Sequence, residues 1–302
     1  MSVSSPTRAV GERGVAAGAR QVVADYVELT KPKVQTLLLL TTVTTMEVAG
    51  SPTASKIALT CLGGYLSAGG AGAVNHYYDR DIDATMRRTA SRPIPASRIS
   101  PRAALIYGCS LAALSFLLLS LTVNVLAASL AFGGFAGYVG VYTVWLKRRT
   151  PHNIVIGGAA GAMPPLVAWA AVRGSLSWTA LYLFAIVFYW TPPHFWSLSL
   201  LMKAEYAKAG VPMMPVVRGE QETRRQIVLY TLLLYAISQL PFCAHVFGGF
   251  YLVASIVLGC AFIGGSLWLY RRADRRTALR LYLFSLIYLA LLFGAMVADV
   301  KL

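Results

Sequence analysis

Long apolar stretches separated by short polar connections set the pattern of this sequence. An apolar window of about 20 residues is long enough to cross a lipid bilayer as an α-helix. The pattern predicts nine windows, each expected to form one spanning helix: residues 34–50, 57–78, 103–122, 125–146, 154–172, 177–202, 227–247, 249–270 and 279–299. The predicted fold class is therefore all-α, a polytopic membrane protein with nine transmembrane helices.

The composition agrees with a membrane location. Hydrophobic residues make up 57% of the 302 residues and charged residues 13%, whereas soluble domains carry about a quarter charged residues. A formal net charge of +15 would suggest nucleic acid as the partner of a soluble protein, but here the bases lie between the apolar windows. We therefore expect the lipid bilayer as a partner, and no nucleic acid.

The positive charges lie mainly in alternate connections. They occupy the N-terminal segment and the connections after the second, fourth, sixth and eighth windows. Of the 27 Lys and Arg residues, only Lys56, Arg173 and Lys301 lie elsewhere. Basic connections face the cytoplasm in membrane proteins. The split predicts a bacterial inner (plasma) membrane protein with its N-terminus in the cytoplasm; the mitochondrial inner membrane is the alternative.

The chain is predicted to form one membrane domain, residues 27–302, after a disordered cytoplasmic tail, residues 1–26. Residues 1–22 contain no apolar stretch typical of a signal peptide. This segment is rich in Arg and Ala, so a mitochondrial targeting segment is the alternative, although Glu12 counts against it. The four cysteines form no CxxC pair, which disfavours a zinc site or a disulfide.

An acidic cluster ends the second predicted helix. Asn75, Asp79 and Asp83 are spaced i, i+4, i+8, which places their oxygen-bearing side chains on one face of a helix. Such hard oxygen ligands suit Mg2+, which binds carboxylates together with water and substrate phosphate oxygens. Arginines follow immediately and are phosphate ligands. The spacing predicts a metal–phosphate site, with an ordinary solvated helix end as the alternative.

Further motifs accompany the acidic cluster. In chain order they are LTKPK (29–33), DRDID (79–83), KRRT (147–150), NIVIGG (153–158), GAMPPL (161–166), WTPPHFW (190–196) and GVPMMPV (210–216). Together they resemble the UbiA-type intramembrane prenyltransferases, and within them the protoheme IX farnesyltransferase (heme O synthase) branch. The resemblance extends from about residue 27 to about residue 225, and the last three windows resemble the family mainly in hydropathy.

The resemblance implies a UbiA-like bundle around a central cavity, capped by the connections after the second and sixth helices. It implies transfer of a farnesyl group from farnesyl diphosphate to a vinyl group of protoheme IX (heme B), with addition of water, to give heme O on the way to heme A. Mg2+ is the implied cofactor, and heme A synthase is an implied partner. Many relatives carry a second aspartate-rich motif after the sixth helix, where this chain has only Glu205, so the number of metal ions stays open.

The predicted site combines a metal ion with two substrates. Asp79 and Asp83 are expected to hold Mg2+, with Asn75 as a neutral oxygen ligand. The residues expected to contact a substrate are mainly cationic or aromatic: Lys31, Tyr78, Arg87, Arg88, Arg92, Lys147, Arg148, Asn153, Trp190 and His194. Aromatic faces are predicted to shield an allylic cation. The alternative for the aromatics is packing in the core or at the lipid interface.

His194 follows Pro192 and Pro193 inside the sixth predicted helix. Two prolines free backbone carbonyls and are expected to kink the helix. We predict that His194 contacts protoheme, as an iron ligand or at a propionate, because ionisable groups inside membranes are usually functional. The alternative is a hydrogen bond from His194 to a freed carbonyl.

Two other functions stay open on the sequence alone. A UbiA-type prenyltransferase with a quinone precursor as acceptor shares the acidic face, but it predicts a second paired-aspartate motif. A membrane transporter would explain a helix broken at Pro192 and Pro193, since transporter sites lie near the midplane on broken helices. The acidic cluster lies instead at a helix end on the basic side, which favours metal–phosphate chemistry.

Overall fold

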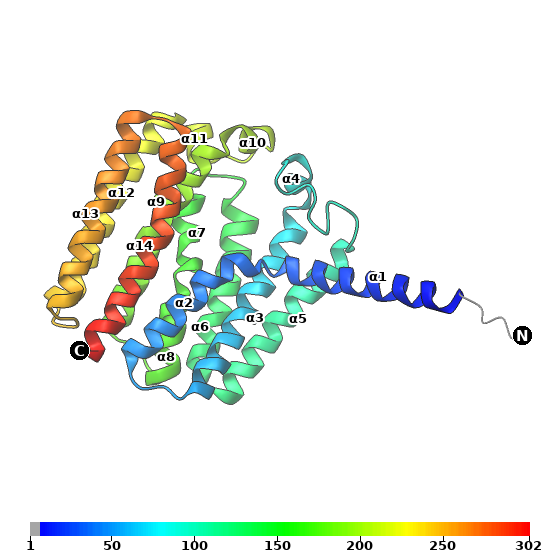
Figure 1. Ribbon diagram of the computed structural model, residues 1–302, viewed down its shortest axis with the longest axis horizontal. Helices are drawn as coiled ribbons and strands as arrows, with labels where there is room; N and C mark the ends of the chain where they lie inside the picture. Colours follow the sequence, from blue (N-terminus) through cyan, green and yellow to red (C-terminus); the bar gives the residue numbers. More distant parts are fainter. Residues whose placement is uncertain (1–6) are drawn as a thin grey trace, which may run out of the picture.

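The computed structural model describes residues 7–302, and the side chains from residue 18 onward. No β-strand occurs among the described residues, which confirms the all-α prediction. Long helices pack side by side, and the short helices of two connections lie at one end of the bundle (Figure 1). In chain order the helices are α1 (Thr7–Leu29), α2 (Pro32–Ala49), α3 (Ala54–Tyr78), α4 (Arg80–Thr85), α5 (Pro101–Thr122), α6 (Val125–Ala136), η1 (Gly137–Leu146), α7 (Asn153–Gly161), α8 (Met163–Arg173), α9 (Trp178–Leu201), α10 (Lys203–Lys208), α11 (Met214–Val217), α12 (Gly219–Cys243), α13 (Gly249–Arg272) and α14 (Arg275–Lys301).

Each predicted window coincides with one helix or with two consecutive helices. Seven helical segments of the described chain are long and apolar enough to cross a membrane, with α6 and η1 counted as one segment and α7 and α8 as another. The helices α2 and α9 fall outside this set. Threonines and charged residues dilute the apolar run of α2, and α9 contains prolines and many aromatic residues. The number of nine spans therefore stays a prediction.

Helix α1 occupies most of the segment predicted to be a disordered tail. Residues 7–26 are helical, and residues 1–6 lie outside the described residues. The helix leaves the bundle sideways in Figure 1. Near its end, Asp25 is 2% exposed and accepts a hydrogen bond from Arg98 Nε at 2.9 Å. The end of α1 is thereby fixed to the loop before α5.

Glycines allow α3 and α5 to pack closely. A Cβ atom on Gly70 would lie 2.6 Å from the carbonyl oxygen of Gly108, and a Cβ atom on Gly108 would lie 2.8 Å from the carbonyl oxygen of Gly70. Small residues at such contacts let helix backbones approach each other in membranes. This contact fixes the position of α3, which carries the acidic cluster at its end.

The helices α9, α12, α13 and α14 form the other half of the bundle, with buried tyrosines whose hydroxyls are paired. The hydroxyl of Tyr251 donates to the carbonyl of Ser238 at 2.7 Å, and the hydroxyl of Tyr288 lies 3.1 Å from Ser238 Oγ. The carboxylate of Asp299 on α14 accepts from the backbone N–H of Tyr251 at 2.9 Å, so α14 caps the first turn of α13. This half of the bundle positions α9 and α14 against each other.

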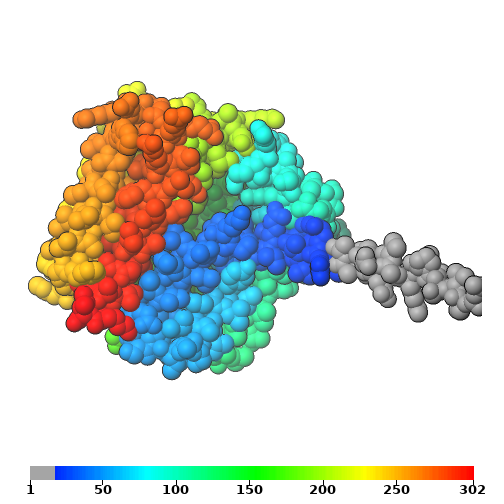
Figure 2. Space-filling view, in the orientation of Figure 1, coloured from blue at the N-terminus to red at the C-terminus, as the bar shows by residue number. Residues whose placement is uncertain are grey.

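A hollow opens on the face of the molecule shown in Figure 2. It is bordered by α2, by α14 and by the segment that follows α3. The connections over residues 79–102 and 203–226, expected to cap a cavity, contain the short helices α4, α10 and α11 at one end of the bundle (Figure 1). The acidic cluster belongs to this end, because it lies where α3 passes into α4.

Candidate active site

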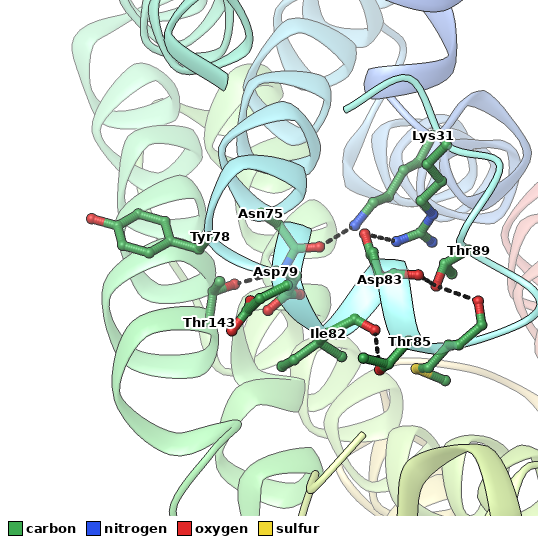
Figure 3. A network of polar contacts seen from close by, with 12 residues as sticks. Lys31, Asn75, Tyr78, Asp79, Ile82, Asp83, Thr85, Thr89 and Thr143 are labelled. Atoms are coloured by element: carbon green, nitrogen blue, oxygen red, sulfur yellow. Dashed lines mark hydrogen bonds and ion pairs between the residues drawn. The ribbon is translucent and has the colours of Figure 1, made fainter. Parts of the chain in front are cut away.

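The acidic cluster lies at a break between two helices. Helix α3 ends at Tyr78, Asp79 is its C-cap residue with φ −90° and ψ 6°, and α4 begins at Arg80. Even so, Asn75, Asp79 and Asp83 are 3%, 0% and 3% exposed. Asn75 Nδ2 donates to Asp79 Oδ2 at 2.6 Å, and the backbone N–H of Asp83 donates to the carbonyl of Asp79 at 2.7 Å. The structure brings the three predicted metal ligands together (Figure 3).

Two basic side chains pair with the two carboxylates. Lys147 Nζ contacts Asp79 Oδ2, and Arg92 Nη1 lies 2.7 Å from Asp83 Oδ2. The side chains of Lys147 and Arg92 are only 13% and 19% exposed, so salt screens these pairs weakly. Lys147 directly follows η1, and Arg92 lies in the loop after α4. The two ion pairs thus hold three segments of the chain around one site.

A third cation, Lys31, lies between α1 and α2 and donates from Nζ to Asn75 Oδ1 at 2.5 Å (Figure 3). Burial, together with the positive charges of Arg92 and Lys147, lowers the pKa of Lys31 from 10.5 to about 7. A bound anion would favour the protonated form of Lys31, because opposite charges stabilise each other. We call Lys31, Asn75, Asp79, Asp83, Arg92 and Lys147 the acid–base cluster.

The acid–base cluster has the donor atoms that Mg2+ prefers. Asp79 Oδ1 is fully buried and has no hydrogen-bond partner among the described residues. Such an orphaned oxygen is costly to bury, and a cation satisfies it. Among the described residues, no group of three or more His, Cys, Asp or Glu side chains lies close enough together to hold a metal ion. The candidate ligands are two carboxylates and the amide oxygen of Asn75, and these donor atoms suit Mg2+ when water or substrate oxygens complete the set.

Other basic residues predicted to bind diphosphate lie outside this cluster. Arg148 donates through two nitrogens to the two carboxylate oxygens of Asp81, at 2.8 and 2.7 Å. This hydrogen bonding lowers the pKa of Asp81 to about 2 and raises the pKa of Arg148. Arg87 and Arg88 are exposed, and the backbone N–H of Arg88 lies 3.4 Å from Glu205 Oε2 on α10. That contact links the two connections expected to cap the site.

Tyr78 and Asn153, two further predicted substrate contacts, occupy different surroundings. The Tyr78 residue is 40% exposed, and its side chain points away from the acid–base cluster in Figure 3. Asn153, at the start of α7, is fully buried; its Nδ2 donates to the carbonyl of Thr150 at 2.7 Å, and its Oδ1 has no partner among the described residues. Substrate contacts by these two residues stay predictions.

His194 and Trp190 form a second buried group, between α9 and α14. Helix α9 continues through Pro192 and Pro193 without a break. His194 is 6% exposed and stacks on Trp190 with 4.4 Å between the ring centres. Its Nδ1 lies 2.7 Å from the hydroxyl oxygen of Ser285 on α14. The partner of His194 is therefore a hydroxyl group, and not one of the carbonyls that the prolines free.

Sequence reasoning missed Thr143, a polar residue beside the acidic face. Thr143 Oγ1 accepts from Asn75 Nδ2 at 3.1 Å. His76, next to Asn75, is 1% exposed, and both of its ring nitrogens lack partners among the described residues. The i, i+4 spacing of Thr143 and Lys147 was a signal that both face the same site. The partners of Asn75 across the bundle had no such local signal.

A buried acidic face surrounded by cations, at one end of an all-α bundle, is what a membrane prenyltransferase needs to bind a diphosphate. The model of the UbiA prenyltransferase family matches residues 37–292, and the chain belongs to this family. Among its relatives, a protoheme IX farnesyltransferase from Symbiobacterium thermophilum is 54% identical over 93% of this chain and 95% of the relative. Another, from Roseiflexus sp., is 52% identical over 93% of this chain and 53% of the relative. The chain thus spans about half the length of the Roseiflexus relative.

Solved structures agree with this assignment at the level of the fold. A structure concerned with digeranylgeranylglyceryl phosphate synthase superposes with a TM-score of 0.76 at 19% identity, over 93% of this chain and 100% of that chain. A UbiA homolog from Archaeoglobus fulgidus bound to DMAPP and Mg2+ superposes with a TM-score of 0.62 at 16% identity, over 90% of this chain and 99% of that chain. The chain therefore has the UbiA fold.

Proposed function

We propose that this chain transfers the farnesyl group of farnesyl diphosphate to a vinyl group of protoheme IX, with addition of water, to give heme O and diphosphate. The observation that carries the proposal is the acid–base cluster, in which two buried carboxylates and an amide lie against three cations. Membership of the family supports prenyl transfer, and the names of relatives at about 52% identity support protoheme as the acceptor.

The diphosphate group of the donor binds at the cations of the acid–base cluster. Lys31, Arg92 and Lys147 carry N–H groups that donate hydrogen bonds to phosphate oxygens as readily as to a carboxylate. Arg92 and Lys147 balance the two carboxylates, and Lys31 adds a further positive charge when a bound polyanion favours its protonated form. In this proposal the three bases exchange part of their contacts with the acidic side chains for contacts with the diphosphate.

Asn75, Asp79 and Asp83 hold Mg2+ next to that diphosphate. When bound, the ion neutralises the charge that develops on the leaving diphosphate. The protein positions the two substrates and keeps water from the farnesyl cation until the vinyl group has attacked it. One C–O bond of the donor breaks, a C–C bond to the vinyl group forms, hydroxide from water adds to the neighbouring carbon, and the proton of that water is released.

The acceptor protoheme binds toward α9 and α14, where His194 and Trp190 lie. His194 is buried and ionisable, and buried ionisable groups inside membranes are usually functional. The proposed location is a bacterial inner membrane with the basic connections in the cytoplasm, in line with the charge distribution. Heme A synthase is the proposed recipient of the product.

Incubation of the purified protein with farnesyl diphosphate, protoheme IX and Mg2+, followed by mass analysis of the extracted heme, tests this function. We expect a heme whose mass has increased by one farnesyl group and one hydroxyl group, with an equal amount of diphosphate released. Release of diphosphate with unchanged heme, and prenylation of an added aromatic quinone precursor, would contradict protoheme as the acceptor. Absence of any diphosphate release under all conditions would favour a transporter.

A further inference from the structure

A small cavity lies between the ends of α9, α12, α13 and α14. It has a volume of about 210 Å³ and is lined by the last turns of α9 and α13, the first two turns of α12, the α13–α14 connection and the first turn of α14. This connection lies at the same end of the bundle as α10 and α11 (Figure 1). No lining residue belongs to the acid–base cluster. Pockets for drug-sized ligands have roughly 300–1,000 Å³, so this cavity suits a smaller group.

Arg224 on α12 lines the cavity and is a mostly buried arginine with few polar contacts. Its side chain is only 14% exposed, and its Nε is fully enclosed with no hydrogen-bond partner among the described residues. Glu220 Oε2 lies 3.6 Å from Arg224 Nη1, which is too long for a hydrogen bond. A guanidinium carries five N–H donors, and burying such donors unpaired is costly. Arg224 therefore needs an acceptor that the described residues do not supply.

The two acidic residues that line the cavity have other partners. Glu220 Oε1 accepts from Lys203 Nζ at 3.0 Å. Asp274 caps α14, because its Oδ1 accepts from the backbone N–H of Thr277 at 2.8 Å and its Oδ2 from the hydroxyl of Thr277 at 2.9 Å. Neither carboxylate makes a hydrogen bond to Arg224. The positive charge of Arg224 is thus only partly balanced by the residues around the cavity.

Further positive charges surround the cavity. Arg275 lines it and donates from Nη1 to the carbonyl of Leu201 at 3.1 Å, which joins the start of α14 to the end of α9. Three exposed arginines lie next to the lining residues in the chain: Arg271, Arg272 and Arg276. A concave site surrounded by one sign of charge attracts a counter-ion. The ligand that fits this cavity is therefore a small anion.

We propose that this cavity binds a phosphate group, held by Arg224 and Arg275, either as the headgroup of an anionic phospholipid or as free phosphate. The N–H groups of a guanidinium donate in parallel pairs to phosphate oxygens. Basic pockets between membrane helices are known to bind phospholipid headgroups. The bound phosphate would join α12 to α14 and stabilise the folded protein. The site lies apart from the acid–base cluster, so this inference does not depend on the proposed function.

Binding is measured with the full-length protein, purified in detergent and stripped of phospholipid. One arm uses radiolabelled inorganic phosphate without Mg2+, and the other uses phosphatidylglycerol followed by native mass spectrometry, with uncharged phosphatidylcholine as the comparison. The test variant is Arg224→Met and the matched control is Arg225→Met. Arg225 also has an acid at 3.6 Å, Glu222, but its side chain is 65% exposed and does not line the cavity.

We expect Arg224→Met to raise the Kd for the phosphate-bearing ligand roughly 10-fold or more, on the scale of lost hydrogen bonds to a charged group. Arg225→Met should stay within about 2-fold of the wild type, since exposed ion pairs contribute little. The ligand should raise the thermal midpoint of the wild type and of Arg225→Met, but not that of Arg224→Met. Without ligand, Arg224→Met should be at least as stable as the wild type, because it loses a buried charge without hydrogen bonds.

The two arms identify the source of the phosphate. A loss in Arg224→Met of phosphatidylglycerol binding supports a lipid headgroup, and a loss of inorganic phosphate binding supports free phosphate. If Arg224→Met does not fold, Arg275→Met at an exposed position replaces it and should weaken the same ligand roughly 3-fold or more. Equal binding of both ligands by the wild type and the variants, or no binding of either ligand, would overturn the proposal.

Discussion

Arg92 and Asp83 join the loop after α4 to the acidic face, with 2.7 Å between Arg92 Nη1 and Asp83 Oδ2. The loop is also held independently of this ion pair. Thr89 Oγ1 donates to the carbonyl of Asp83 at 2.9 Å, and Arg98 Nε donates to Asp25 at 2.9 Å. Because these other contacts keep the loop in place, Arg92 is able to exchange a carboxylate for a phosphate oxygen without release of the whole loop.

We predict that Arg92→Ala raises KM for farnesyl diphosphate by roughly 10-fold or more, since it removes a guanidinium able to donate to phosphate oxygens from a poorly screened site. Steady-state kinetics with saturating protoheme measures this effect. The control is Arg102→Ala, because Arg102 is exposed and makes no hydrogen bond or ion pair with the acid–base cluster among the described residues. Equal KM values for the two variants would show that Arg92 does not contact the donor.

Lys147 and Arg148 are adjacent bases in different environments. Lys147 is 13% exposed and pairs with Asp79, whereas Arg148 is 42% exposed and pairs with Asp81. We predict that Lys147→Ala lowers kcat/KM for farnesyl diphosphate roughly 100-fold, on the scale of losing one preorganised charge at a reacting group. Arg148→Ala should change it by about 3-fold or less, since exposed ion pairs contribute little.

The thermal midpoint of each purified variant in detergent is the control for folding in this pair. Both variants should stay folded at the assay temperature, so that the difference in kcat/KM reports on the site. If Arg148→Ala is the more damaging substitution, then the diphosphate binds at the exposed side of α4 and not at the acid–base cluster.

The close contact of α3 and α5 gives a prediction for stability. A Cβ atom added at Gly70 would meet the backbone of α5 at 2.6 Å, so Gly70→Ala should destabilise the fold by about 1–3 kcal/mol. Gly64→Ala on the same helix is the control, because a Cβ atom at Gly64 has no neighbour within 4 Å. Thermal unfolding in detergent should show a lower midpoint for Gly70→Ala only. A Gly64→Ala variant that unfolds equally early would mean that loss of glycine in α3, and not the contact, is responsible.

The sequence predicted most of the fold because the apolar pattern that identifies membrane helices is local and periodic along the chain. Apolar windows identify helices in a membrane protein, since lipid leaves no other way to satisfy the backbone of an isolated span. The sequence pattern did not indicate α1, which includes residues 7–26 of the segment expected to be a tail. The hydrogen bond from Arg98 to Asp25 helps to fix the end of that helix. These two residues are far apart in the sequence, so no local pattern predicts their contact.

The sequence predicted the acidic half of the candidate site directly, and its bases only as part of a larger set of basic residues. The i, i+4, i+8 spacing identified Asn75, Asp79 and Asp83 even though the helix breaks at Asp79, because the break keeps the backbone of Asp83 hydrogen-bonded to that of Asp79. The predicted set did not separate the bases of the cluster from exposed ones such as Arg148, because ion pairs between distant segments decide which bases are buried. The contact of Ser285 with His194 was missed because it depends on the packing of α14 against α9, which spacing within one helix does not specify.

Binding of Mn2+ together with unreactive farnesyl thiolodiphosphate, measured by electron paramagnetic resonance, tests most directly whether the acid–base cluster holds a metal–diphosphate complex. Mn2+ takes the same oxygen ligands as Mg2+. The account predicts that the wild type and Asp81→Asn, whose carboxyl is exposed and bound to Arg148, immobilise Mn2+ when the diphosphate is present. It predicts that Asp79→Asn, folded but without its carboxylate, does not. Immobilised Mn2+ in Asp79→Asn, with loss of binding in Asp81→Asn, would contradict it.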